Sequence, residues 1–390
     1  MKVSLKKILE IKNTFINEEK YKCITFCNKK IYIKKQISIV EKLRDIKSRY
    51  LFSKYTIRKN SVLLVEPNAY HGEILPGFVK YFQDLGFNVD LILRYKNYDD
   101  SPFLDFKNLN IIPSSSVNMR TLLKNKKIKK YEHCLLTSSA LWDNNFYFGS
   151  FLKFLGFTPN IKKEVMLVEH NIMPCIEEFN EEYYLKNNKL FTLSGMSNTL
   201  MLNPHYFTEK INFTKNFITI FITSGHDIKG LDLIFETTKK LLETNYSNFK
   251  IFIIGKKIRI PQQFNTNISS LGYVSFKKMY DLLYKSDFIL PMLDPNNDKH
   301  KKYLNQTTFG ARQQCLGFLK PMLINEVFAK VYDFDDTNAI AYKENDLYEA
   351  MKQAIEMTQE DYSKKQMFLK NLANEVYNQS LNNLRKAIEE

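Results

Sequence analysis

The stretch SVLLVEPNAYHGEILPGFVKYFQDLGFNVDLIL, residues 61–93, decides the fold. It opens on a continuous apolar run, residues 61–65, of the length expected for a strand buried on both faces. A polar loop follows, and then a segment that ends at Leu85-Gly86, where a glycine suits the end of a helix. A second apolar run, residues 88–93, completes a strand–loop–helix–strand unit, whose crossover is expected to be right-handed.

Strands and helices continue to alternate through the rest of the chain. Further strands are predicted at residues 110–113, 131–137, 164–170 and 190–193. The pattern restarts near residue 217, with strands at 217–223, 249–255, 287–290 and 321–324 and helices at 229–243, 275–285, 307–317 and throughout 347–387. Such alternation is typical of doubly wound parallel sheets. We therefore expect an α/β protein with two lobes and a ligand cleft between them.

The composition indicates a globular protein. The chain has 390 residues, of which 44% are hydrophobic and 14% aromatic, enough for two or three domains with real cores. Its five cysteines are scattered, which favours a reduced, cytoplasmic setting. The first residues, MKVSLKKILEIKN, do not have the pattern of a secretory signal, and no apolar stretch approaches the ~18 residues of a membrane helix.

Positive charge is concentrated at the N-terminus. Residues 1–60 contain 17 Lys and Arg but only 5 Asp and Glu, whereas residues 61–390 contain 40 and 37. A hairpin is predicted within residues 19–35, and a basic helix at 36–55 with Ile39, Leu43, Ile46 and Tyr50 on one stripe. We expect this extension to contact an anionic membrane surface or an anionic glycan, since each basic residue near an anionic lipid surface contributes about 1 kcal/mol. Packing on the first lobe is the alternative, and nucleic acid is not expected.

Polar residues follow two predicted strands of the first lobe. His71 and Glu73 lie in the loop after the first strand, and Glu169, His170 and Asn171 end a later one. A histidine at such a place can deprotonate a hydroxyl group, so His71 and then His170 are the candidate catalytic residues. Glu73, Glu169 and Asn171 are candidates for binding the acceptor, that is, the substrate that carries this hydroxyl group. Glu73 also suits a helix N-terminus for electrostatic reasons alone.

The second lobe contains candidate phosphate-binding turns. Gly225, His226 and Lys229 form a small turn between a strand and a helix, where free backbone N–H groups and the helix dipole attract phosphate. A second polar junction opens the helix at 307–317, and its candidate nucleotide-binding residues are Thr307, Thr308, Gly310, Arg312 and Gln314. Arg312 suits a solvent-exposed position on the helix equally well. No metal-binding pattern is present, and no metal site is predicted.

The motifs of residues 217–330 resemble a known family. Their order is strand, G-x-x-x-K-G, L-G-Y-V, helix, S-D-F-x-L-x-P, F-G and G-x-x-K-P, which is similar to the donor lobe of GT-B glycosyltransferases, especially the large retaining family 4-type group. The resemblance implies that Lys229 and His226 hold a diphosphate. It also implies that Gln306 and Gln314 stand where that group has two glutamates, the second of which contacts ribose. Two amides at these positions depart from the pattern.

The resemblance implies a GT-B fold and sugar transfer. The expected domains are a basic extension (1–60), an acceptor lobe (61–210), a donor lobe (211–345) and terminal helices packing back on the first lobe (346–390). The expected co-substrate is a nucleotide-diphosphate sugar without a bound cofactor. The basic hairpin also looks like that of lipooligosaccharide and capsule transferases, so a lipid-linked or polymeric surface glycan is the expected acceptor. A nucleotide-sugar epimerase and a non-catalytic glycan- or membrane-binding relative remain alternatives.

Overall fold

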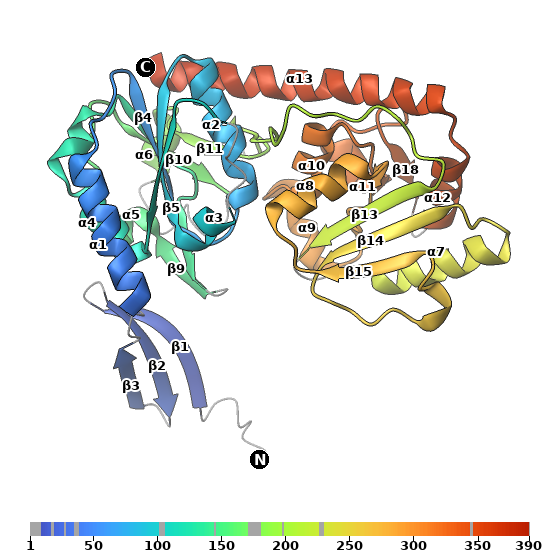
Figure 1. The fold of residues 1–390 in the computed structure, drawn as a ribbon, viewed down its shortest axis with the longest axis horizontal. Coiled ribbons are helices and arrows are strands. Elements are labelled where there is room, and N and C mark those ends of the chain that lie inside the picture. The colour runs from blue at the N-terminus through green and yellow to red at the C-terminus, as the bar shows by residue number, and fades with distance from the viewer. Residues whose placement is uncertain are drawn as a thin grey trace. The chain divides into compact units, whose positions relative to one another are not determined.

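The computed structural model describes residues 9–16, 19–26, 29–34, 39–100, 106–143, 146–170, 181–196, 199–225, 230–343 and 346–389 (Figure 1). The chain divides into two compact units. The first contains Met1–Gly72, Phe78–Phe191 and Lys386–Glu390, and the second contains Glu73–Gly77 and Thr192–Arg385. Among the described helices, none is both long and apolar enough to cross a membrane.

The first unit is built on a sheet with the strand order β6-β5-β4-β7-β10-β11, in which the strands from β6 to β10 run parallel to one another. Its strands are β4 (Ser61–Glu66), β5 (Asn88–Arg94), β6 (Leu109–Ser114), β7 (His133–Leu136), β10 (Val165–Glu169) and β11 (Leu190–Thr192). All of β4 and β7 is buried, as their apolar runs predict. The order reverses between β4 and β7, and such a switch point is where doubly wound sheets bind ligands, beyond the carboxyl ends of the strands.

Helices and short elements connect these strands. They are the helices α2 (Leu75–Asp84), α3 (Tyr95–Asp99), α4 (Ser116–Leu123), α5 (Phe151–Leu155) and α6 (Glu181–Lys186), the single turns η2 (Gly72–Ile74) and η3 (Lys126–Lys130), and the antiparallel pair β8 (Ala140–Asp143) and β9 (Phe146–Ser150). The core of the unit lies between the sheet and the helices α1 (Ile39–Lys54), α4 and α5, with Phe52, Leu63, Met119 and Phe151 all buried.

The N-terminal extension contains one more strand than predicted. Strands β1 (Leu9–Ile16), β2 (Glu19–Phe26) and β3 (Lys29–Lys34) form an antiparallel sheet in that order, so the predicted hairpin β2–β3 is confirmed and β1 is added. Helix α1 (Ile39–Lys54) follows, as predicted. The alternating pattern of β1 is weak in sequence because Lys12 and Asn13 interrupt it.

Helix α1 packs on the first unit through polar side chains. Asp45 is buried and accepts hydrogen bonds from Tyr95 Oη at 2.8 Å and Ser115 Oγ at 2.6 Å. Arg44 pairs with Asp99 at 2.7 Å, and Arg49 donates to Asn118 Oδ1 at 3.0 Å. The predicted apolar stripe faces the other way: Ile39, Leu43, Ile46 and Tyr50 are 54–76% exposed. Polar contacts therefore fix the helix and leave its apolar stripe at the surface.

The second unit repeats the same design. Its four-stranded parallel sheet has the order β15-β14-β13-β16, and a bridge from Ile289 to Met322 continues it towards the parallel pair β17-β18. The strands are β13 (Thr219–Gly225), β14 (Phe249–Gly255), β15 (Ile268–Gly272), β16 (Phe288–Ile289), β17 (Leu323–Asn325) and β18 (Ile340–Tyr342). The first strand again lies between the second and the fourth, so the switch point of this sheet lies between β13 and β16.

The remaining elements of the second unit complete its layers. They are the short strand β12 (Leu200–Met201), the turn η4 (Gln262–Phe264) and the helices α7 (Leu231–Glu243), α8 (Phe276–Lys285), α9 (Asp298–Asn305), α10 (Gly310–Phe318), α11 (Glu326–Val331), α12 (Leu347–Glu356) and α13 (Gln359–Glu389). The predicted helical tail is thus two helices, and they separate at Met357.

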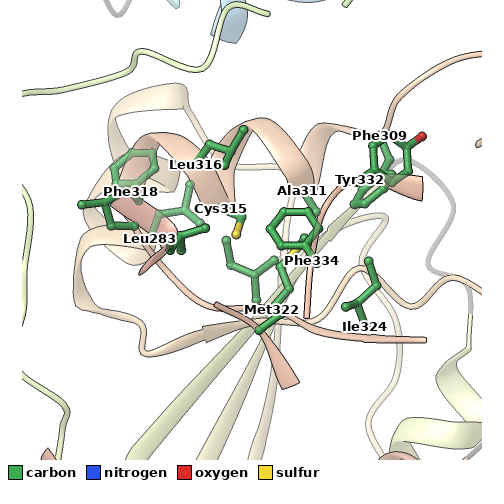
Figure 2. Close-up of a cluster of buried hydrophobic side chains, with 14 of the residues drawn as sticks. Leu283, Phe309, Ala311, Cys315, Leu316, Phe318, Met322, Ile324, Tyr332 and Phe334 are labelled. Carbon is green, nitrogen blue, oxygen red and sulfur yellow. The ribbon is translucent and has the colours of Figure 1, made fainter. Parts of the chain in front are cut away.

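Helix α10 is held by a dense apolar core. Figure 2 shows Cys315, Leu316 and Phe318 of α10 among Leu283, Met322, Ile324 and Phe334. A Cβ at Gly317 would lie 2.1 Å from the backbone oxygen of His205, so only glycine permits this approach of the helix to the segment before β13. The core therefore fixes the position of the polar residues that α10 carries.

Candidate functional site

Glu66 occupies the switch point of the first sheet. It is the last residue of β4 and is 0% exposed. Its carboxylate accepts hydrogen bonds from Asn68 N, Thr137 Oγ1 and Ser138 Oγ, each at 2.8 Å. Thr137 and Ser138 follow β7, the strand on the other side of the switch point. A buried carboxyl group with three donors has its oxygens held in one position.

His71 and His170 meet beside this carboxylate. Their ring centroids lie 4.6 Å apart, with the ring planes inclined at 46°. His71 is exposed and has a φ of 61°, a left-handed conformation that non-glycine residues adopt rarely and often at functional sites. The structure thus brings the two predicted catalytic histidines together, on a loop after β4 and at the end of β10.

His170 is neutral at physiological pH. Its Nε2 lies 2.8 Å from Thr137 O, and because a carbonyl oxygen only accepts, Nε2 carries the hydrogen and Nδ1 does not. Burial and the neighbouring positive charge of His71 lower the pKa of His170 to about 3. This histidine therefore contacts His71 as a neutral ring held by Thr137.

The charges of Glu66 and His71 are coupled. Burial raises the pKa of Glu66, while the charge of His71 and the hydrogen bonds from Asn68, Thr137 and Ser138 oppose that rise. A carboxylate in this place favours a positive imidazole, which is the form that a histidine base takes after it has accepted a proton.

The remaining candidates of the first lobe are distributed differently. Glu169 is the last residue of β10 and is 3% exposed, and its carboxylate accepts a hydrogen bond from Ser139 Oγ. Strand β7 lies between β10 and β4, the strand that carries Glu66. Glu73 lies in η2, and its backbone oxygen accepts from Tyr280 Oη at 3.0 Å, a contact within the second unit. Asn171 lies outside the described residues.

Two elements meet at the switch point of the second sheet. Ser224, near the end of β13, donates through Oγ to Gln314 Oε1 of α10 at 3.2 Å. Gly225 ends the strand, and Gly230, with a φ of 67°, begins α7. This positive φ favours glycine at position 230, whereas a Cβ there would meet only the flexible end of the Met292 side chain, at 2.8 Å. His226 and Lys229 lie outside the described residues.

The N-terminus of α10 offers unobstructed space. Apart from its chain neighbours and the backbone of its own helix, no heavy atom of the described residues lies within 4 Å of a Cβ built on Gly310, which is exposed. The first N–H groups of such a helix attract anions. Thr307 and Thr308 precede it, and the oxygen of Thr307 accepts from Tyr332 Oη at 2.9 Å.

The side chain of Arg312 lies in a different pocket from Ser224 and Gln314. It is 4% exposed, its Cζ lies 5.0 Å from the centre of the Tyr332 ring, and it lines a pocket that does not include Ser224 or Gln314. Residues 312 and 314 lie about 200° apart around a helix, which explains why the two side chains contact different neighbours.

Two further motifs have structural roles. Asp287 of S-D-F-x-L-x-P is buried and accepts from Ile220 N at 2.7 Å and Asn216 N at 2.9 Å. Lys320 of G-x-x-K-P is 0% exposed and donates to Asn212 O at 3.1 Å. Burial lowers the pKa of Lys320 to about 8, and Asp287 partly opposes this. Both residues fasten the segment before β13, away from the carboxyl ends of the strands.

No group of three or more His, Cys, Asp or Glu side chains suited to a metal ion occurs in the described part of the chain.

The known proteins were compared with the chain by family model, by sequence and by structure. No family model and no curated protein sequence matches it. A glycosyltransferase from Rickettsia africae ESF-5 is similar in structure, with a TM-score of 0.56 and 14% identity over 85% of this chain and 99% of that one. AviGT4, a glycosyltransferase of avilamycin A biosynthesis, has a TM-score of 0.48 and 12% identity over 83% and 98% of the two chains.

The similarity to the Rickettsia africae structure and the two doubly wound units indicate the same fold. The protein is α/β and has the GT-B fold of two Rossmann-like lobes, which confirms the predicted fold class.

The sequence reasoning did not single out Glu66. The available signal was an acidic residue that ends an otherwise apolar strand, V-L-L-V-E, together with the hydroxyl run Thr137-Ser138-Ser139 after β7. Either is common at a strand end, and only the pairing of β4 with β7 brings the two together.

Proposed function

We propose that this protein is a glycosyltransferase that moves a sugar from a nucleotide-diphosphate donor to a hydroxyl group of a bacterial surface glycan. One observation carries the proposal: in a GT-B fold, polar side chains gather at the switch point of each sheet, Glu66 with His71 and His170 in one and Ser224 with Gln314 in the other. Ligands of doubly wound sheets bind at these points.

In this proposal the second unit binds the donor. Lys229 and the N–H groups at the start of α10 neutralise the diphosphate, and Gln314 contacts the ribose. An amide bonds a hydroxyl group less strongly than a carboxylate does, so moderate affinity is expected. No metal ion is needed, because the positive groups and the helix dipole stabilise the leaving diphosphate.

The first unit supplies the acid–base chemistry. His71 removes the proton of the acceptor hydroxyl as that oxygen attacks the anomeric carbon of the sugar. The bond from that carbon to the diphosphate breaks, and the nucleoside diphosphate leaves with the electron pair. Glu66 stabilises the protonated His71, and His170 positions its ring.

A binding screen tests the donor assignment. A panel of nucleoside diphosphates is added to the full chain, and thermal unfolding is followed. A nucleotide at a hundredfold excess over its Kd stabilises the native state by roughly 2.7 kcal/mol. We expect at least one nucleotide to raise Tm and Lys229→Ala to abolish the shift. No shift with any nucleotide would contradict the proposal.

We further propose that the acceptor is lipid-linked or polymeric and that the N-terminal segment holds the protein at an anionic membrane surface. Helix α1 supports this, because its exposed apolar residues Ile39, Leu43, Ile46 and Leu51 lie beside exposed basic ones, among them Lys42 and Lys47. An apolar face flanked by lysine is typical of helices that lie in the lipid interface. Charge complementarity favours lipid over a neutral protein partner.

A further inference from the structure

A second polar pocket lies wholly within the second unit. Its volume is about 320 Å³, and it is formed by the segment after β11, by β12, by the end of α11, by the middle of α13 and by one residue of α10. The polar side chains that line it belong to Ser194, Thr199, Arg312, Asp333, Gln379 and Asn383. Pockets of roughly 300 Å³ and above are the size of small-molecule sites.

Arg312 is a buried cation in this pocket, and Asp333, which also lines the pocket, is one of its electrostatic neighbours. Among the described residues, none forms a hydrogen bond with its Nε or Nη1, although both atoms are buried. The ring of Tyr332 lies 5.0 Å from its Cζ, a cation–π contact that leaves these N–H groups unsatisfied. Burial lowers the pKa of Arg312, yet a guanidinium stays charged in proteins. Buried N–H groups without hydrogen bonds are costly, and a bound oxyanion would satisfy those of Arg312.

The walls of the pocket are already ordered. Thr199 Oγ1 lies 2.6 Å from Thr192 Oγ1, and Asn383 Nδ2 donates to Met201 O at 2.9 Å, which joins α13 to β12. Gly195 has a φ of 70°, and its Cβ position lies 3.1 Å from Met201 Cβ, so the turn before Thr199 admits only glycine without strain. Hydroxyl and amide groups on fixed walls suit a ligand rich in hydroxyl groups.

We propose that this pocket binds a monosaccharide that carries an oxyanion, with the phosphate or carboxylate group on Arg312 and the sugar hydroxyls on the polar walls. A guanidinium binds such groups with two parallel hydrogen bonds. The site is separate from the donor site, because Gln314 contacts Ser224 while Arg312 faces α13 and β12. The inference does not depend on the proposed glycosyl transfer.

Calorimetric titration of the full chain without nucleotide tests the proposal. The probes are glucose 6-phosphate, glucuronate, inorganic phosphate and glucose. We expect one of the two acidic sugars to bind at least tenfold more tightly than glucose and than inorganic phosphate. Which one binds identifies the oxyanion. Equal affinity for inorganic phosphate and glucose 6-phosphate with no binding of glucuronate, or no binding of either acidic sugar, would overturn the proposal.

Two charge variants locate the site. Gln379 is an exposed residue of α13 at the pocket, so Gln379→Glu places a negative charge beside the ligand and should weaken binding at least threefold. Asn374→Asp introduces the same charge at an exposed position about 140° away around α13 and should leave binding unchanged. Equal effects of the two variants would contradict a site at Arg312.

Unfolding of an Arg312→Met variant separates binding from a structural role. Because two buried N–H groups of Arg312 form no hydrogen bond, its replacement should leave Tm unchanged or raise it in the absence of ligand, and should abolish the rise in Tm caused by the acidic sugar. A lowered Tm together with an intact ligand-induced shift would show that Arg312 stabilises the fold and does not bind the anion.

Discussion

The rings of His71 and His170 lie 4.6 Å apart between centroids, and Thr137 joins them to Glu66: its backbone oxygen lies 2.8 Å from His170 Nε2, and its hydroxyl group donates to the Glu66 carboxylate. One residue after β7 therefore orients both neighbours of His71. Replacing His71 and replacing Glu66 should therefore have different effects.

Replacing His71 should remove the base. For His71→Ala at saturating donor we expect the transfer rate to fall by a factor of ~100 to 10,000, the usual contribution of a general base. His133→Gln is the matched control, since His133 is a buried histidine at the opposite end of β7. A His71→Ala rate within a few-fold of that of the unmodified protein would exclude the base role and leave His170 as the next candidate.

Glu66→Gln should lower the rate without unfolding the protein. The amide can still accept from Asn68 N and can donate to the hydroxyl groups of Thr137 and Ser138, so the packing is retained. The negative charge that stabilises the protonated His71 is lost, and we expect about a tenfold or greater fall in kcat with little change in KM for the donor. Unchanged kcat, measured beside an unchanged Tm, would show that Glu66 is structural only.

Gln314→Ala should weaken nucleotide binding about tenfold, the value of one hydrogen bond of roughly 1.4 kcal/mol. Gln313→Ala is the control, because Gln313 is an equally buried glutamine of the same helix. Calorimetry with the nucleoside diphosphate found in the screen would decide the matter. Equal losses in both variants would indicate damage to α10 rather than a lost ribose contact.

Lys320 should make stability depend on pH. Its pKa is about 8 in the folded chain and its ordinary value is 10.5, so between these values the unfolded chain binds more protons and stability rises with pH. The full gain is about 3 kcal/mol at 1.36 kcal/mol per unit. In urea unfolding, the stability of the unmodified protein should increase relative to Lys320→Met from pH 8 to 10. Lys330 is exposed, so the stability of the unmodified protein relative to Lys330→Met should stay constant from pH 8 to 10. Parallel pH profiles for the unmodified protein and Lys320→Met would refute the assignment.

The apolar stripe of α1 should insert into anionic vesicles. Leu43→Asn with Ile46→Asn removes two side chains that are each worth up to about 1.5–3 kcal/mol when buried, so vesicle partition should fall at least tenfold. Phe217→Asn with Val327→Asn, exposed residues of the second unit, is the control. Sedimentation with neutral and anionic vesicles, at low and high salt, gives the measurement. Equal partition onto both vesicle types, or onto neither, would remove the membrane role.

The fold followed from local patterns in the sequence. Buried parallel strands such as β4 and β13 are apolar runs bounded by glycine and polar residues. In the helices between such strands, apolar residues recur at the spacing that places them on one buried face. The exposure of Ile39 and Leu43 did not follow, because a stripe specifies which residues share a face and not which neighbour covers it. The pocket around Arg312 depends on β12 and α13, which are distant in sequence and meet only through tertiary packing.

Transfer of sugar from a nucleotide donor tests the central claim most directly. The full chain is incubated with radiolabelled nucleotide-diphosphate sugars and with lipid-linked or polymeric surface glycans, in the presence of EDTA, and labelled product and released nucleoside diphosphate are both counted. We predict equal amounts of the two products with one donor, and the loss of both in His71→Ala. A nucleotide sugar that is epimerised with no label reaching any acceptor, or a donor that binds and is never consumed, would contradict glycosyl transfer.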